Sequence, residues 1–136
     1  MVVMVMDGQG GGIGAAVIKA LRRDVSAELE ILALGTNSIA TSCMMKAGAN
    51  RGATGENAIV RTCPKVDFII GPLAIIISNS MMGEVTPHMS EAVCSSEAKK
   101  ILIPLTQERV EIVGVTFEPL PHMVEYAIKR LIQEIF

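Results

Sequence analysis

The 136-residue chain lacks tryptophan and has few other aromatic residues, three phenylalanines and one tyrosine. It therefore offers few surfaces on which the bases of a single-stranded nucleic acid could stack. Positive charge is not in excess either, because twelve Lys and Arg against fourteen Asp and Glu give a formal net charge of −2 at pH 7. A dedicated nucleic-acid binder normally carries a basic excess. The composition argues against a nucleic acid as a partner.

Cysteine is also scarce, and its spacing matches neither a disulfide framework nor a zinc site. The three cysteines are Cys43, Cys63 and Cys94. We interpret them as reduced, mostly buried side chains of a cytoplasmic protein. The most apolar stretch, residues 66–77, is too short and too interrupted to span a bilayer, and no secretory signal is visible. The sequence predicts a cytoplasmic location and no membrane partner.

Half of the residues are hydrophobic, which suffices for one core in a single domain over residues 1–136. Apolar runs alternate with helical patterns, which predicts a doubly wound, three-layer, Rossmann-like α/β domain with a mostly parallel sheet of about five strands. The predicted strands are 2–6, 30–34, 66–70, 100–104 and 111–115. The last two are too close for a helical crossover, so the fifth is free to run antiparallel at an edge.

Helix signals occupy most of the intervening segments. The predicted helices are 13–23, 39–47, a short one ending near 62, 87–95 and 121–135. Asn37 or Ser38 is expected to cap the second helix, Thr54 the short one, and Thr86 the fourth, where a proline follows it. We expect residues 50–55 to form a glycine-rich loop. Periodicity does not decide the structure of residues 73–77.

The strongest chemical signal is a glycine-rich loop between the first predicted strand and the first predicted helix. Its residues are Asp7, Gly8, Gln9, Gly10, Gly11, Gly12, Ile13 and Gly14. Glycines there allow a sharp turn and let backbone N–H groups reach a phosphate, while the helix N-terminus adds unpaired donors and about half a positive charge. The loop predicts a phosphate or nucleotide site. The alternative is a tight turn that binds no ligand.

The end of the second strand normally selects the cofactor, through an acid for a ribose hydroxyl or an arginine for a 2′-phosphate. Here that place holds Thr36, Asn37 and Ser38, which can bond a ribose or phosphate, or can simply cap the helix. Gly71 and Pro72, after the third predicted strand, complete the predicted cofactor-binding set. The cofactor is left open between NAD or NADP and another phosphorylated nucleotide.

Further polar residues could converge on the same edge of the sheet around a phosphate, although the favoured interpretation places them in ordinary loops. They are Arg51, Glu56, Asn79 and Glu84. His88 and His122 have no ligand-like spacing, so no metal site is predicted. No nucleophile–base pair can be assigned, so the catalytic residues, and whether the protein is an enzyme, are left open.

The loop spacing Gly8-x-x-x-Gly12-x-Gly14 resembles the cofactor loop of short-chain dehydrogenases and reductases. That family pairs a tyrosine with a lysine four residues later, whereas Tyr126 is followed at this spacing by Arg130. The whole chain resembles a family of small bacterial Rossmann-type proteins described as a domain of unknown function. The matching segments are 7–14 (DGQGGGIG), 33–60, 71–87 and 99–105. This resemblance implies a Rossmann-like fold and no assigned activity.

These observations favour a protein that binds a small phosphorylated ligand, as a small oxidoreductase or a cofactor sensor. The competing interpretation is a non-enzymatic structural or interaction module. The high apolar content and nine methionines suggest more apolar surface than one small domain hides. A homo-oligomer is therefore expected, joined through the last helix or through residues 73–82.

Overall fold

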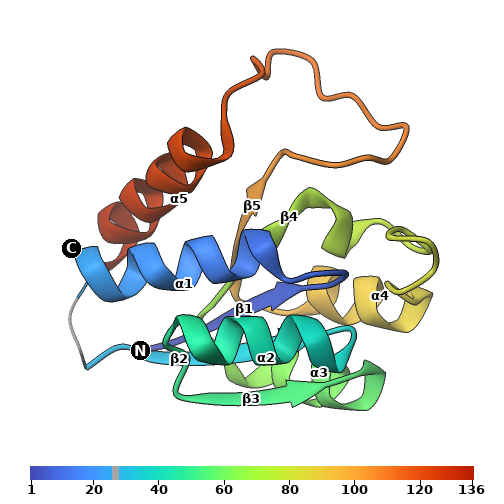
Figure 1. Ribbon diagram of the computed structural model, residues 1–136, viewed down its shortest axis with the longest axis horizontal. Coiled ribbons are helices and arrows are strands. Elements are labelled where there is room, and N and C mark those ends of the chain that lie inside the picture. Colours follow the sequence, from blue (N-terminus) through green and yellow to red (C-terminus); the bar gives the residue numbers. More distant parts are fainter. Residues whose placement is uncertain (26–27) are drawn as a thin grey trace.

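The computed structural model describes residues 1–25 and 28–136. Within them, five parallel strands form one sheet with helices on both faces (Figure 1). The strands are β1 (Val2–Asp7), β2 (Glu30–Gly35), β3 (Arg51–Thr54), β4 (Phe68–Pro72) and β5 (Lys99–Ile103). Their order is β3-β2-β1-β4-β5, and every neighbouring pair is parallel. The order reverses between β1 and β4, which confirms a Rossmann-like arrangement.

Five α-helices connect these strands or follow them in the described residues. They are α1 (Gly12–Asp24), α2 (Ser38–Ala47), α3 (Glu56–Thr62), α4 (Pro87–Ser95) and α5 (Leu120–Ile135). Two short 3₁₀ helices, η1 (Cys63–Lys65) and η2 (Leu73–Ile76), flank β4. In the part of the chain described, no helix has both the length and the apolar character needed to cross a bilayer.

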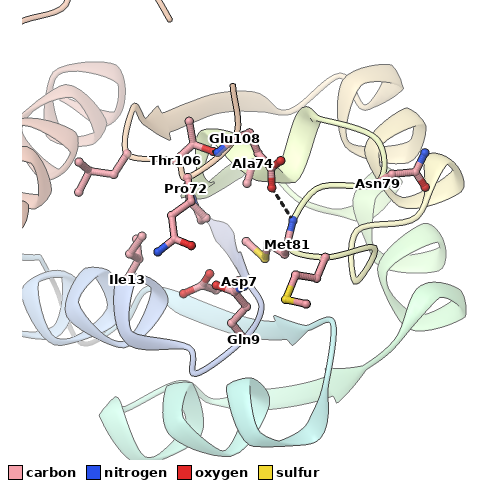
Figure 2. Close-up of a pocket in the computed structure, with 12 residues that line it drawn as sticks. Asp7, Gln9, Ile13, Pro72, Ala74, Asn79, Met81, Thr106 and Glu108 are labelled. Carbon is pink, nitrogen blue, oxygen red and sulfur yellow. Dashed lines mark hydrogen bonds between the residues drawn. The ribbon is translucent and has the colours of Figure 1, made fainter. Parts of the chain in front are cut away.

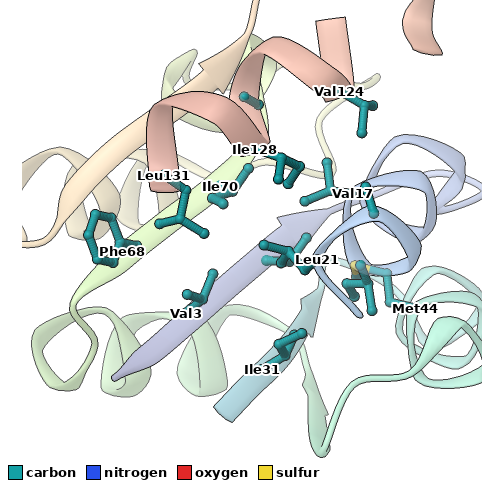
Figure 3. Packing of buried hydrophobic residues seen from close by; sticks show 14 of the residues in the cluster. Val3, Val17, Leu21, Ile31, Met44, Phe68, Ile70, Val124, Ile128 and Leu131 are labelled. Carbon is teal, nitrogen blue, oxygen red and sulfur yellow. The ribbon is translucent and has the colours of Figure 1, made fainter. Parts of the chain in front are cut away.

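The side chains of β1, β2, β4 and β5 alternate between two hydrophobic cores, as the period of two requires. Val3 of β1 and Ile70 of β4 face the layer of α1, α2 and α5, where they meet Leu21 and Leu131 (Figure 3). Met4 of β1 faces the other core, beneath α3 and α4. The central strands β1, β2 and β4 are therefore buried on both faces, whereas the edge strand β3 is exposed.

Local sequence signals predicted much of this architecture. The apolar runs at 2–6, 30–34, 66–70 and 100–104 correspond to β1, β2, β4 and β5, with small shifts at the ends. Asn37 caps α2 by accepting a hydrogen bond from the Ala40 amide at 2.8 Å. Thr86 caps α4 by accepting one from the Met89 amide at 3.2 Å.

The predicted strand at 111–115 is wrong. Gly114 adopts φ 89°, and the Val115 amide donates to the Ile112 carbonyl at 3.2 Å, so a turn interrupts the apolar run. The sheet still has five strands, but the additional one is β3, at the edge opposite β5. It pairs with β2 in parallel, not antiparallel as expected for the strand at 111–115. Thr54 ends this strand and does not cap α3, whose N-cap residue is Gly55.

Candidate functional site

A cavity of about 590 Å³ lies beyond the carboxyl ends of the central strands, where the strand order reverses (Figure 2). This is the place where open α/β sheets bind ligands, and the volume is in the range of small-molecule sites, about 300–1,000 Å³. Its lining comes from the loops after β1, β4 and β5. The lining residues are Asp7, Gln9, Ile13, Pro72, Ala74, Asn79, Met81, Met82, Leu105, Thr106, Gln107 and Glu108.

The buried carboxylate of Asp7 forms the centre of the glycine loop. Its Oδ1 accepts a hydrogen bond from the Gly8 amide, and its Oδ2 accepts one from the Gly14 amide, both at 2.8 Å. Burial raises the pKa of Asp7 above its ordinary value of 3.8, against the lowering effect of these amides and that of Ile13, while the nearby Glu84 charge adds to the rise. The first turn of α1 is thus wrapped around a carboxylate of the chain itself.

Glu84 ties the same loop to the end of β2. Its Oε1 accepts hydrogen bonds from the Gln9 amide at 2.8 Å, the Thr36 hydroxyl at 2.7 Å and the Asn37 side-chain amide at 2.8 Å. Burial would raise the pKa of Glu84, but these bonds outweigh it and lower the pKa below 4.5. An acid is therefore present at the end of β2, but it comes from a segment after β4.

Three glycines of the loop are required by packing. A Cβ atom on Gly8 would lie 2.4 Å from the Thr36 hydroxyl oxygen, and one on Gly14 would lie 2.5 Å from the Met44 sulfur. Gly11 has φ 73°, and its Cβ would lie 2.8 Å from the Ala40 Cα. These glycines serve the turn and the close approach of α2.

Gly10 and Gly12 differ from the other loop glycines. A Cβ atom on either residue would have nothing within 4 Å, and neither residue has a positive φ. Within the described residues, their amides donate to no protein acceptor. Gly10 follows Gln9 and Gly12 precedes Ile13, and both of these neighbours line the cavity. The fold alone does not explain why these positions are glycine, whereas the close approach of a ligand to the backbone would.

Unusual backbone conformations gather around the same cavity. Among the described residues, every non-glycine residue with positive φ lines it, with φ between 49° and 65°. These are Gln9, Asn79, Met81 and Met82. Such conformations are unfavourable for residues with a side chain and concentrate at functional sites. This clustering independently identifies the cavity as a candidate site.

Polar and apolar residues contribute equally to the cavity wall, and none of its described residues is basic. Asp7 and Glu108 supply carboxylates, and Glu108 accepts a hydrogen bond from the Met81 amide at 2.7 Å (Figure 2). Side-chain amides and a hydroxyl complete the polar set. In the described chain, no three His, Cys, Asp or Glu side chains are arranged to hold a metal ion. A ligand here meets hydrogen-bond acceptors and neutral donors.

The structure separates the predicted site residues into two groups. Asp7, Gln9, Ile13 and Pro72 line the cavity. Thr36 and Asn37 bond to Glu84 instead, and Ser38 is the first residue of α2. Gly71 lies in β4, where a Cβ would come within 2.4 Å of the Met6 carbonyl oxygen, so packing requires this glycine.

The four further polar candidates do not converge on one phosphate. Asn79 lines the cavity, but Arg51 pairs with Glu30 at the exposed edge of the sheet. Glu56 is the first residue of α3, accepts a hydrogen bond from the Thr86 hydroxyl and lines a different cavity, between α3 and α4. Residues 105–108 also line the cavity but were not predicted from the sequence, because that segment precedes a predicted strand that does not form.

We expect substitution by alanine to destabilise the fold at the packed loop glycines and to have little effect on stability at the open ones. Gly11→Ala places a side chain in a left-handed conformation against α2 and should lower the free energy of unfolding by about 1–3 kcal/mol. Gly12→Ala adds a methyl group in open space on a helix and should change it by less than about 1 kcal/mol. Urea unfolding of both variants measures this difference. Equal destabilisation would contradict the described packing.

The lowered pKa of Glu84 predicts a pH-dependent contribution to stability. The contribution should be fully present above pH 4.5 and disappear as the pH falls through the lower folded-state pKa, because the unfolded state then binds more protons. Glu84→Gln should therefore lower the Tm at pH 7, and its difference from wild type should shrink below pH 4.5. Glu91→Gln, on the exposed side of α4, is the control. A difference that does not vary with pH would contradict this role.

No curated protein matches the chain. Among solved structures, the chain is similar to a dodecameric FMN-dependent UbiX-like decarboxylase from Escherichia coli O157:H7. The identity is 15%, the alignment covers 96% of this chain and 75% of that chain, and the TM-score is 0.46. Residues 2–136 match the family described as domain of unknown function DUF3842. The chain therefore belongs to this family, as its resemblance to a Rossmann-type family of unknown function predicted.

Proposed function

We propose that the cavity binds a small phosphorylated ligand, and that a mononucleotide is the class that fits it best. The observation that carries this proposal is the pair of open glycines, Gly10 and Gly12, at the N-terminus of α1. Backbone amides there are suited to a phosphate, and a hydrogen bond to a charged group contributes about 1.5–3 kcal/mol. Two such bonds would supply about 3–6 kcal/mol of the roughly 8 kcal/mol that micromolar binding requires.

The rest of the wall suits the uncharged part of a nucleotide. The Glu108 carboxylate accepts the Met81 amide through Oε1, and its other oxygen can accept a hydrogen bond from a ribose hydroxyl or from the amino group of a base. Gln9, Asn79 and Gln107 can both donate and accept. A second phosphate would find no cation among the described lining residues, which disfavours di- and triphosphates.

Glu84 favours a mononucleotide over NAD or NADP. In a dinucleotide fold, a ribose hydroxyl bonds to the acid at the end of the second strand. Here the Oε1 atom of Glu84 already accepts from Gln9, Thr36 and Asn37. Thr36 and Asn37, at the place that would bind the adenosine half of a dinucleotide, are thus already bonded to Glu84. The cavity toward β4 and β5 stays open.

Binding is better supported than catalysis. The carboxylates at the cavity accept hydrogen bonds from backbone amides, and no cysteine or histidine is among the described residues that line it. A sensor or carrier of a mononucleotide needs only the cavity and the loop. This proposal keeps the non-enzymatic interpretation of the sequence and adds a ligand to it.

The proposal predicts selective thermal stabilisation. Nucleotide-stripped protein is heated with AMP, GMP, FMN, NAD, NADP, ATP, coenzyme A or inorganic phosphate. A ligand at 100 times its Kd adds about 2.7 kcal/mol, which corresponds to about 8–13 °C for a chain of this length. A mononucleotide should give the largest shift, because it places one phosphate on the loop amides and donors on the carboxylates.

Two variants distinguish ligand binding at the glycine loop from nonspecific stabilisation by the ligand. Gly12→Ala should keep the Tm of the free protein but lose most of the shift, because the added methyl group occupies the space of the phosphate. Ser95→Ala, exposed on α4, should keep the full shift. No shift with any mononucleotide, or an unchanged shift in Gly12→Ala, would refute the proposed site.

A further inference from the structure

The segment between β5 and α5 exposes an unusual number of apolar side chains. Residues 104–119, here called the arm, contain no helix or strand and extend from the body of the protein (Figure 1). Val113 is 97% exposed and Phe117 is 82% exposed. The other exposed apolar residues of the arm are Val110, Ile112 and Val115. Connections of this length without secondary structure are uncommon and are usually functional. The exposed apolar side chains on the arm indicate a surface that binds a partner.

A second apolar surface lies beside the arm. A cavity of about 310 Å³ opens between β5, α5 and the two ends of the arm. Its lining includes Ile101, Ile103, Met123 and Ala127 from β5 and α5, and Pro104, Val115, Thr116 and Glu118 from the arm of the same chain. Tyr126, at 51% exposure, belongs to the same lining. Because β5 is the last strand of the sheet and pairs with β4 alone in the described chain, its outer edge is unpaired. Unpaired edges readily accept another chain.

The two surfaces have opposite charge. The arm carries three glutamates and one arginine, a net charge of −2, from Glu108, Arg109, Glu111 and Glu118. β5 and α5 carry four basic and two acidic residues, a net charge of +2, apart from the histidine of α5. These are Lys99, Lys100, Glu125, Lys129, Arg130 and Glu134. Charge complementarity of this kind steers association and selects the partner.

We propose that the arm of one copy of this chain packs into the cavity between β5 and α5 of a second copy. One chain carries both complementary surfaces, so two copies can exchange arms about a two-fold axis and leave neither surface exposed. Phe117 and Tyr126 supply the aromatic anchors that such contacts favour. This inference does not depend on the proposed ligand.

Sedimentation velocity of the full chain over a range of concentrations tests the contact. The wild type should sediment as a species of at least twice the chain mass of 14.5 kDa. The double variant Val113→Asp, Phe117→Asp should sediment as a monomer, with an unchanged circular dichroism spectrum because both side chains are exposed. Ile39→Asp is the matched control, since Ile39 is 71% exposed on α2, and it should assemble like the wild type.

Three results would overturn the proposal. One is a wild type that stays monomeric at its highest soluble concentration, including the case in which the monomer binds lipid vesicles through the arm. The other is a double variant that assembles as tightly as the wild type. Dissociation of Ile39→Asp as well would also count against it, because the contact would then not be specific to the arm.

Discussion

Two carboxylates of the chain itself hold the glycine loop in the conformation on which the cavity depends. Asp7 accepts hydrogen bonds from the amides of Gly8 and Gly14, and Glu84 accepts one from the amide of Gln9. These bonds satisfy donors that the start of a helix otherwise leaves unpaired. Because Asp7 ends β1 and Glu84 follows β4, they fix the loop from both sides of the point where the strand order reverses.

This constraint shapes the chemistry that the cavity can offer. A loop whose amides partly bind internal carboxylates has fewer donors for a ligand, and those of Gly10 and Gly12 are the ones left open in the described chain. Several phosphates would be repelled by Asp7 and Glu108 with no lining cation to compensate. A ligand with one phosphate and several hydrogen-bond donors satisfies both parts of the wall.

Features set by neighbouring residues could be predicted from the sequence, whereas those set by distant contacts could not. Apolar runs located β1, β2, β4 and β5, and Asn37 and Thr86 were recognisable as helix caps. All four residues of β3 are exposed, and its sequence carries no apolar pattern. The bond between Gln9 and Glu84 joins residues 75 positions apart, and no local signal reports such a contact. The sequence therefore predicted the glycine loop, but not the contact with Glu84 that stabilises its conformation.

The most direct test of this account is the response of the loop amides to a ligand. ¹⁵N-labelled protein is titrated with AMP and with FMN, and the amide resonances of Gly10 and Gly12 are followed. The account predicts saturable shifts at both glycines with at least one of these ligands, and little change at Gly52 in the distant strand β3. Saturable binding that leaves Gly10 and Gly12 unshifted, or no binding of either ligand, would contradict it.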